Sequence, residues 1–231
     1  MRKTLMRKTP GQTRLADEAF RQLEELIVTL RLPPGEVVTE PELAEMIGIG
    51  RTPTREAVQR LAAQGLVRVK AGKGLFITET NPYEHLALLE ARATLEYLLA
   101  RRAAALAGEP ERQALEDCGL RMAERARAGD VEGFMRQDKD FDLIVARAAR
   151  NRFASAAVAP MQTMSRRFWY AHHGREDLEP AALRHLAVME AIRAQDPDAA
   201  SAASDALLSH LWHAARRVVE AETASEMALG A

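Results

Sequence analysis

The sequence predicts a mainly α-helical protein made of an N-terminal winged helix-turn-helix and a C-terminal all-α bundle of six or seven helices. Residues 39–78 read as a short helix, a tight turn, a second helix and two strands joined by a glycine-containing turn. Beyond residue 82 the apolar residues recur at helical spacing. Charge divides the chain at the same place: residues 1–78 hold 13 Lys and Arg against 9 Asp and Glu, whereas residues 79–231 hold 19 against 24. A basic first part suits a nucleic-acid-binding domain.

The composition of the 231 residues is that of an ordinary globular protein, with 47% hydrophobic and 28% charged residues. No apolar run approaches the length of a membrane span, and the N-terminal MRKTLMRKT lacks the apolar segment of a secretory signal. The lone Cys118 excludes an intramolecular disulfide and is typical of a reducing compartment. We therefore expect a cytoplasmic protein without a membrane partner.

The segment before the helix-turn-helix is predicted to form one helix and one short strand. Residues 1–13 carry four basic residues and no acid, and we expect them to be a flexible basic N-terminus. Residues 14–31 place their apolar side chains on one helical stripe, and the Pro-Pro-Gly run at 33–35 ends that helix. Residues 36–38 can add a strand to the wing. The predicted DNA-binding domain therefore spans residues 14–78.

The two helices of the helix-turn-helix have clear end signals. Thr39 can cap the first helix, with Glu42 three residues later completing a capping box. Gly48 ends it, because glycine tolerates the left-handed conformation of a helix stop. The second helix begins near Arg51, with Pro53 in its first turn, where a missing N–H costs nothing.

Basic and polar side chains gather where such a fold reads DNA. Arg51 and Arg55 lie four residues apart on one helical face, and Arg binds guanine O6 and N7 with two hydrogen bonds. The predicted DNA-contacting set consists of Arg51, Thr52, Arg55 and Gln59 on the second helix, with Gly72 and Lys73 at the tip of the hairpin. The alternative is a solvated basic helix in an unrelated α/β domain.

Residues 79–82 form the predicted linker, and the rest of the chain is predicted to be helical. The expected helices cover residues 83–107, 111–128, 130–150, 152–172, 181–194 and 197–222, with a loop at 172–180 and a flexible tail at 223–231. Asn151 is expected to end the third of these helices in the left-handed conformation. Pro160 implies a bend or break in the fourth.

Four residues of the bundle have the side chains of metal ligands. Asp138 and Asp142 lie four residues apart on one helix, so both carboxylates project from the same face. His185 and His210 come from two other helices, each on an apolar stripe. Oxygen and nitrogen donors that converge from several helices are how bundle cores hold metal ions. From the pattern alone, core-edge histidines and a solvated acidic run remain the alternative.

The N-terminal motifs resemble those of the GntR family of bacterial transcription regulators. The similarity rests on LPPGE (32–36), LAE (43–45), RTPTREAVQRLAAQGLV (51–67) and the glycines of the hairpin. Two positions depart from the family pattern: Gly50 stands where Ser or Thr is usual, and Pro41 stands where some members place a DNA-contacting Arg. The resemblance implies a homodimer that reads an inverted repeat in double-stranded DNA.

Residues 83–222 resemble the all-helical effector domain (FCD domain) of the FadR-type branch of that family. Many members hold a metal with one Asp and three His, the first two in the motif D-x-x-F-H. The run here is DKDFD (138–142), so Asp142 replaces the first His, while RHLAVMEAI (184–192) supplies His185 and LSHL (208–211) supplies His210. The resemblance implies a divalent ion (Zn, Ni, Mn or Mg), and a second carboxylate tilts the preference toward Mn or Mg.

The resemblance also implies a ligand-binding role for Arg92, which lies in the family's motif R-x-x-L-E. A guanidinium suits an acidic ligand, because its two-pronged donor geometry matches a carboxylate. The alternative is an ordinary pair between Arg92 and Glu96, four residues apart on one helix.

The motifs together predict a ligand-responsive transcription regulator whose helical domain senses a small organic acid. Repressor is the commoner role in such families. No activated nucleophile or phosphate-binding loop is evident in the sequence, so an enzyme is not expected. The alternatives are a helical metal-dependent enzyme fused to a DNA-binding domain, and a DNA-binding dimer that responds to no ligand.

Overall fold

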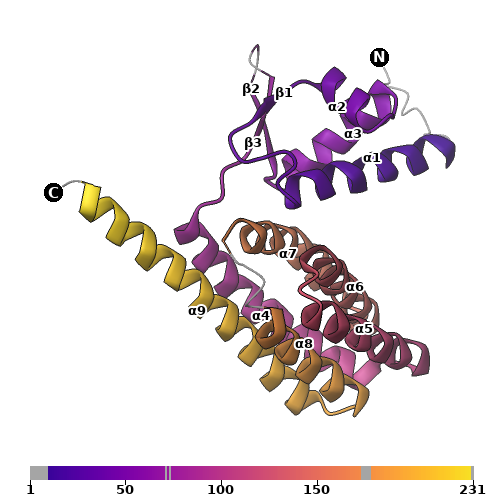
Figure 1. Ribbon diagram of the computed structural model, residues 1–231. Coiled ribbons are helices and arrows are strands. Elements are labelled where there is room, and N and C mark those ends of the chain that lie inside the picture. The colour runs from indigo at the N-terminus through magenta and orange to yellow at the C-terminus, as the bar shows by residue number, and fades with distance from the viewer. Residues whose placement is uncertain (1–9, 71, 73, 173–177, 230–231) are drawn as a thin grey trace. The chain divides into compact units, whose positions relative to one another are not determined.

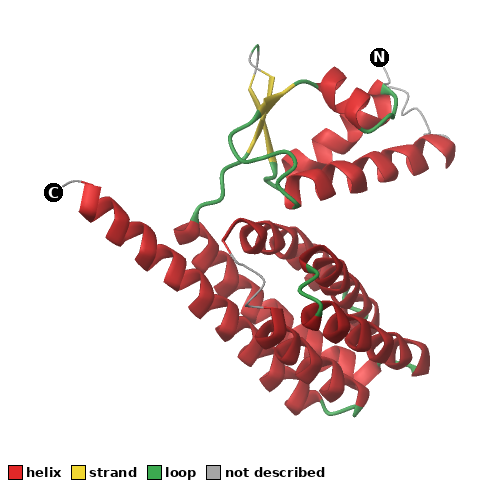
Figure 2. Cartoon of the chain, in the orientation of Figure 1, coloured by secondary structure: helices red, strands yellow, loops and turns green. Residues whose placement is uncertain are grey.

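The chain folds into two compact units, Met1–Thr80 and Asn81–Ala231. The computed structural model describes residues 10–70, 72, 74–172 and 178–229. Helices dominate both units, and a small sheet belongs to the first (Figures 1 and 2). The division between the units falls inside the predicted linker at residues 79–82.

The first unit is the predicted winged helix-turn-helix. Its elements are α1 (Pro10–Val28), β1 (Val37–Val38), α2 (Glu40–Met46), α3 (Arg51–Ala63), β2 (Val67–Lys70) and β3 (Gly74–Ile77). The three strands form an antiparallel sheet in the order β1-β3-β2. Val38 and Val69 both pair with Leu75, one from each side of the central strand β3.

The ends of α2 and α3 follow the local sequence as predicted. The Thr39 hydroxyl accepts a hydrogen bond from the Glu42 backbone N–H, and the Glu42 carboxylate accepts one from the Thr39 N–H at 2.7 Å, which completes the capping box. Gly48 has a φ of 64° and ends the turn after α2. Gly50 caps α3 without a side-chain hydrogen bond, because it lacks the hydroxyl usual in the family.

The wing depends on a close approach of backbone at Gly74. This residue has a φ of 95°, and a Cβ built on it would lie 2.9 Å from the Val38 carbonyl oxygen. Any other residue would strain the backbone and collide with β1. Lys70 pairs with Gly74 across the hairpin, and its ammonium lies 4.1 Å from the centre of the Phe76 ring. The glycine therefore lets the strand pack against β1.

The second unit contains six helices among the residues that the structure describes, in agreement with the predicted bundle. They are α4 (Pro82–Leu106), α5 (Glu109–Arg127), α6 (Val131–Ala149), α7 (Arg152–His172), α8 (Leu178–Arg193) and α9 (Pro197–Leu229). Helices α4 and α9 lie side by side along most of the length of α4 (Figure 1). No helix in the described ranges is both long and apolar enough to cross a membrane.

One buried core holds the bundle together. Leu99 of α4, Met122 of α5 and Phe134 of α6 are at most 2% exposed. Side chains also cap two of the helices: Asn81 accepts from the backbone N–H groups at the start of α4, and Asp130 accepts from the Gly133 N–H at 2.8 Å. Close packing and caps therefore place the inward faces of α4, α6, α7 and α8 around one interior.

The predicted end of α6 is wrong by one residue. The left-handed residue that ends α6 is Arg150, with a φ of 49°, rather than Asn151. Asn151 instead directly precedes α7 and caps it, because its side-chain oxygen accepts from the Ala154 N–H at 3.2 Å. Asn suits both a left-handed stop and a helix cap, so the sequence alone did not separate the two roles. Pro160 lies inside α7, which continues through it as one helix, so the predicted break does not occur and the predicted bend stays a prediction.

Several predicted helix boundaries also shift. Helix α1 begins at Pro10, inside the predicted flexible segment 1–13, and residues 1–9 lie outside the described residues. Helix α8 begins at Leu178, earlier than the predicted residue 181. Helix α9 continues to Leu229, so most of the predicted tail at 223–231 is helical. Capping signals are weak at these ends, which is where helix limits are hardest to predict.

The single cysteine gives a test of the packing. Cys118 is 0% exposed, its thiol donates to the Gln137 carbonyl at 3.3 Å, and burial raises its pKa to about 12. Because the thiolate is the reactive form, we expect iodoacetamide to leave native Cys118 unmodified at pH 8 and to alkylate it fully in denaturant. Mass spectrometry of the intact protein measures both states. Rapid alkylation of the native protein would show that α5 and α6 do not enclose this thiol.

Candidate functional site

The first candidate surface is the outward face of α3. Arg51, Thr52, Arg55 and Gln59 are all exposed, while Thr54, Ala57, Val58 and Leu61 on the other side of the helix are buried. The Thr54 hydroxyl donates to the Gly50 carbonyl at 3.0 Å, which fixes the first turn from the inside. The helix thus presents its predicted contact residues to solvent and anchors itself through the opposite face. We call these four exposed residues the reading face.

A carboxylate of the preceding helix holds one residue of the reading face. The Arg55 Nε lies 2.9 Å from a carboxylate oxygen of Glu40, and their side chains are 63% and 31% exposed. An ion pair as exposed as this one stabilises a fold by about 1 kcal/mol at most. The main effect of this ion pair is on the direction of the Arg55 side chain, which it orients in the absence of any bound partner.

The predicted wing contacts are described only in part. Gly72 is exposed and has a φ of 70°, and a Cβ added to it would meet no atom within 4 Å. Lys73 lies outside the described residues. The position of Gly72 at the end of the β2–β3 hairpin agrees with the predicted tip of the wing.

The second candidate site is a network of charged and amide side chains in the interior of the bundle. It joins α4, α6, α7 and α8. We call it the polar network, and it consists of Arg92, Glu96, Asp138, Asp142, Gln162, Arg166 and His185. The two carboxylate side chains of α6 are only 16% and 10% exposed.

Arg166 of α7 lies between the two aspartates that were predicted to bind a metal. Its Nη1 atom donates to Asp138 at 3.1 Å and to Asp142 at 2.6 Å. The Arg166 side chain is 9% exposed. The prediction that the two carboxylates share one face of a helix is therefore consistent with the structure, since a single nitrogen reaches both.

Asp138 also contacts the predicted histidine ligand of α8. The His185 Nε2 lies 2.9 Å from Asp138 Oδ1, and the His185 Nδ1 lies 2.8 Å from the Ala181 carbonyl oxygen. A carbonyl can only accept, so Nδ1 carries a proton. When Asp138 is ionised it can only accept as well, and Nε2 must then donate. The imidazole thus has a partner at each nitrogen.

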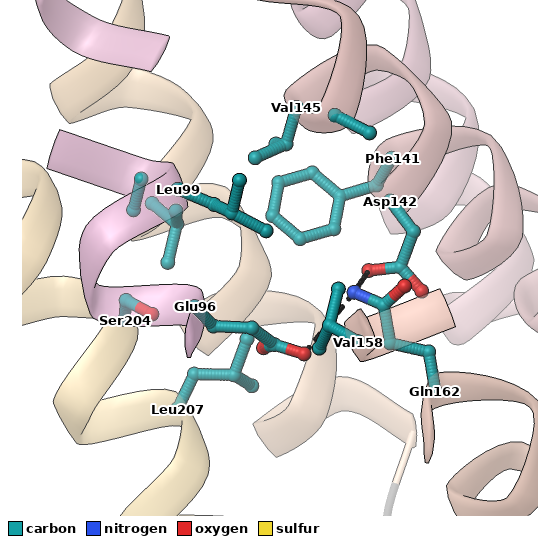
Figure 3. A pocket seen from close by; sticks show the side chains of 12 residues that line it. Glu96, Leu99, Phe141, Asp142, Val145, Val158, Gln162, Ser204 and Leu207 are labelled. Carbon is teal, nitrogen blue, oxygen red and sulfur yellow. Dashed lines mark hydrogen bonds between the residues drawn. The ribbon is translucent and has the colours of Figure 1, made fainter. Parts of the chain in front are cut away.

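Gln162 of α7 connects the aspartates to the arginine of α4. Its amide nitrogen donates to Asp142 Oδ1 at 2.8 Å and to Glu96 at 3.1 Å (Figure 3). Glu96 in turn accepts from the Arg92 Nε at 2.8 Å. Arg92 and Glu96 therefore form the predicted pair, but in the protein interior, where their side chains are only 8% and 10% exposed.

The pKa values of Asp138, Asp142 and His185 depend strongly on one another. Burial raises the pKa of Asp142, and the charge of Asp138 adds to it, so that the pKa reaches about 7 despite Arg166. Burial acts on Asp138 in the same direction, but the hydrogen bond from His185 and the charge of Arg166 outweigh it and hold the pKa of Asp138 well below its usual range. Burial lowers the pKa of His185, whereas the hydrogen bond to Asp138 raises it, and the net effect is a raised pKa.

Two small pockets lie against the polar network. One, which we call the basic pocket, is lined by Arg92, Asp138, Arg166 and His185, with apolar walls from Phe134 and Trp169. The other, the apolar pocket, is lined by Leu99, Phe141, Val145 and Leu207, with Glu96, Asp142 and Gln162 at one side (Figure 3). Each has space for little more than water in this form of the protein.

The predicted metal ligands do not fit a divalent ion as they are arranged. Among the described residues, no group of three or more His, Cys, Asp or Glu side chains is placed to hold a metal. Arg166 lies against both aspartates, where an ion would need their oxygen atoms. His210 of α9 is half-buried and does not line the basic pocket.

Sequence reasoning missed Arg166 and Gln162. Both belong to a buried stripe of α7 that also contains Val158, Ser165 and Trp169, spaced as one helical face. A charged residue on an otherwise inward stripe was the available signal, because such residues are rarely buried without a partner. The identity of that partner depends on the packing of α7 against α6, which the pattern does not contain.

Comparison with known proteins gives the family. A model described as "Bacterial regulatory proteins, gntR family" matches residues 15–77, and one described as "FCD domain" matches residues 87–210, more than half of the chain. The HTH-type transcriptional repressor NanR of Enterobacter is 27% identical in an alignment that covers 92% of this chain and 90% of that protein. An uncharacterized HTH-type transcriptional regulator in an unstable DNA locus of Streptomyces ambofaciens is 39% identical over 77 residues, 33% of this chain and only 32% of that protein.

Solved structures agree on the fold. The structure of E. coli McbR/YncC superimposes with a TM-score of 0.78 at 16% identity, over 89% of this chain and 98% of that chain. The winged helix-turn-helix, the helical bundle and both family matches point to the same class of protein. The chain belongs to the GntR family of bacterial regulatory proteins, carries an FCD domain, and is a DNA-binding transcription regulator rather than an enzyme.

Proposed function

We propose that the protein is a homodimeric, cytoplasmic repressor whose DNA binding responds to a small organic acid. The observation that carries the ligand part is a pocket lined by two largely buried arginines, Arg92 and Arg166. Buried guanidinium groups next to a cavity suit an anionic ligand, and apolar walls at Phe134 and Trp169 suit its carbon part. The relative from Enterobacter is named a repressor, which supports the sign of the proposed response.

The DNA-reading part of the proposal uses the reading face of α3. In a dimer, two such helices enter successive major grooves, so the operator is an inverted repeat in double-stranded DNA. Arg51 and Arg55 reach guanine edges, while Thr52 and Gln59 contact phosphate or neighbouring bases. Gly72 and Lys73 of the wing contact the adjacent backbone or minor groove. The exposure of the four α3 residues and the basic charge of the segment support these roles.

Arg92 is the residue proposed to meet the acidic group of the ligand. Its bond to Glu96 uses only Nε, so the terminal nitrogens of the guanidinium remain for a carboxylate. Burial lowers the pKa of Arg92, but the charge of Glu96 and the hydrogen bond to it raise it, so the pKa is raised overall and Arg92 stays a cation. A fixed cation of this kind recognises an anion without any proton transfer.

Ligand binding changes DNA binding only when the ligand prefers one arrangement of the dimer over another. Helix α4 supplies Arg92 and follows directly on the DNA-binding unit in the chain. A ligand that draws Arg92 and Arg166 together therefore acts on the helix that continues into the linker. A ligand that bound both arrangements equally would leave the operator affinity unchanged.

Arg55 gives the test of DNA reading. We expect Arg55→Ala to lose about 1–3 kcal/mol of specific binding and to distinguish the half-site bases less well, because it removes a two-bonded contact to guanine. Binding is measured by fluorescence anisotropy on an operator enriched from random DNA with the wild-type protein, at fixed salt.

Glu40→Gln is the matched control, since it removes the partner of Arg55 and leaves the reader in place. We expect Glu40→Gln to keep the base preference of the wild type and to bind all DNA somewhat more tightly, because one negative charge is lost. An Arg55→Ala protein with the wild-type base preference would show that Arg55 is no reader.

Arg92 gives the test of ligand sensing. A ligand at a hundred times its dissociation constant adds about 2.7 kcal/mol to the stability of the folded protein, so a thermal melt against a panel of metabolic carboxylates should reveal it. We expect Arg92→Ala to lose this shift. Arg101→Ala, an exposed arginine of the same helix that pairs with Asp198, should keep it. A panel without any active acid would favour the alternative of a DNA-binding dimer that responds to no ligand.

A further inference from the structure

We propose that the guanidinium of Arg166 takes the place of the divalent ion that resembling domains hold, so that this domain binds its acidic ligand without a metal. The ligand half of this inference rests on the proposed function, whereas the exclusion of metal stands on the geometry of the polar network alone.

Every carboxylate oxygen of the two aspartates already has a protein partner. Asp138 gives one oxygen to His185 at 2.9 Å and the other to Arg166 at 3.1 Å. Asp142 gives one oxygen to Gln162 at 2.8 Å and the other to Arg166 at 2.6 Å. A metal could use only the remaining lone pairs of these oxygens, and it would then lie beside the Arg166 guanidinium that already contacts both aspartates. The network is complete as it stands, and a buried polar network with all its partners is the stable kind.

The charge that a metal would supply is also present. Two carboxylates in an interior need a cation nearby, because an unpaired buried charge is costly. Arg166 provides it from within hydrogen-bonding distance of both Asp138 and Asp142. A divalent ion bound to the same oxygens would lie beside a guanidinium that does not lose its proton, and the two cations would repel each other.

Arg166 cannot leave the site easily. Its side chain is 9% exposed, it projects from the inward stripe of α7, and its second terminal nitrogen lies 3.4 Å from the Thr163 hydroxyl. Moving it to solvent would break both ion pairs and open a space in the core. Arg166 is therefore a buried part of the polar network, unlike an exposed arginine that could swing away and leave the two aspartates to a metal ion.

The arrangement specifies the ligand class. The basic pocket presents Arg92 and Arg166 to one ligand, with Phe134, Trp169 and Leu211 around it. A small carboxylic acid with an apolar body matches both features, provided that the pocket widens beyond the water-sized space it has here. Recognition through two planar forks favours a group with two coplanar oxygens, such as a carboxylate, over a neutral or cationic compound.

The first experiment measures metal in the wild-type protein. Tag-free protein is dialysed against Mn²⁺, Zn²⁺ or Ni²⁺, desalted, and analysed by plasma mass spectrometry, while parallel melts are recorded with and without EDTA. We expect no retained ion and an unchanged melting temperature. About one retained ion per chain, or a melting temperature that EDTA lowers, would overturn the proposal.

Variants of Arg166 show whether this residue excludes the metal. Arg166→Met keeps the length of the side chain and removes the charge, and we expect it to bind Mn²⁺ or Zn²⁺ and to melt higher with the ion than without it. Arg166→Lys is the matched control, because it keeps a cation against both aspartates, and it should retain no ion. An Arg166→Met protein that folds and binds no ion would overturn the role of Arg166. If Arg166→Met folds poorly, the metal content of the wild type still decides the proposal.

Thermal melts with acids, recorded with and without EDTA, test this inference separately from the proposed function. An acid that stabilises the wild type should give the same shift in EDTA. A shift that disappears in EDTA would overturn metal-independent binding while leaving the sensing of an acid intact. A panel in which no acid acts would count against the proposed function, and the metal content would then still test the role of Arg166.

Discussion

The interior of the helical domain depends on one interaction, the contact of Arg166 with Asp138 and Asp142. Three charged groups lie where solvent reaches them poorly, and such groups are tolerated only when each has a partner. Removing Arg166 would leave two buried carboxylates without their shared cation, and breaking a buried pair in this way is strongly destabilising. The same contact fixes α7 against α6, and through His185 and Gln162 it extends to α8 and α4. The polar network thereby joins four helices through hydrogen bonds.

In the proposed sensor, the polar network would let a ligand act beyond the site it occupies. Helices held by apolar contacts alone can slide past each other, whereas a network of hydrogen bonds has few alternative arrangements. A ligand that adds a contact at one end of the network would favour one of these arrangements. Arg92 at one end of the polar network and His185 at the other both line the basic pocket. A bound acid would therefore bridge elements that the network already couples. On the reading face of α3, a carboxylate likewise contacts an arginine, since Glu40 accepts a hydrogen bond from Arg55.

Much of this architecture was predictable because it is local. The Thr39 capping box, Gly48 and the glycines of the hairpin are signals that act within a few residues, and the structure reproduces them. The helical spacing of Asp138 and Asp142 likewise placed both carboxylates on one face. The role of Arg166 was not predictable, because it depends on which helix packs against α6. A sequence pattern shows that Arg166 faces inward, but it does not show which side chains Arg166 contacts. Without the position of the Arg166 guanidinium, the two carboxylates suit a metal ion equally well.

The difference between a guanidinium and a metal ion matters for what the domain can recognise. A metal ion accepts ligands from several directions and leaves open positions for water or an effector, whereas a guanidinium offers donors only in its own plane. One terminal nitrogen of Arg166 donates to both aspartates, and these two hydrogen bonds orient its guanidinium. An effector must then match the direction of the remaining donors and of the Arg92 fork, so shape selects it more strictly than charge alone. In the proposed sensor, the response to the acid would not depend on the metal supply of the cell, because Arg166 would provide the cation.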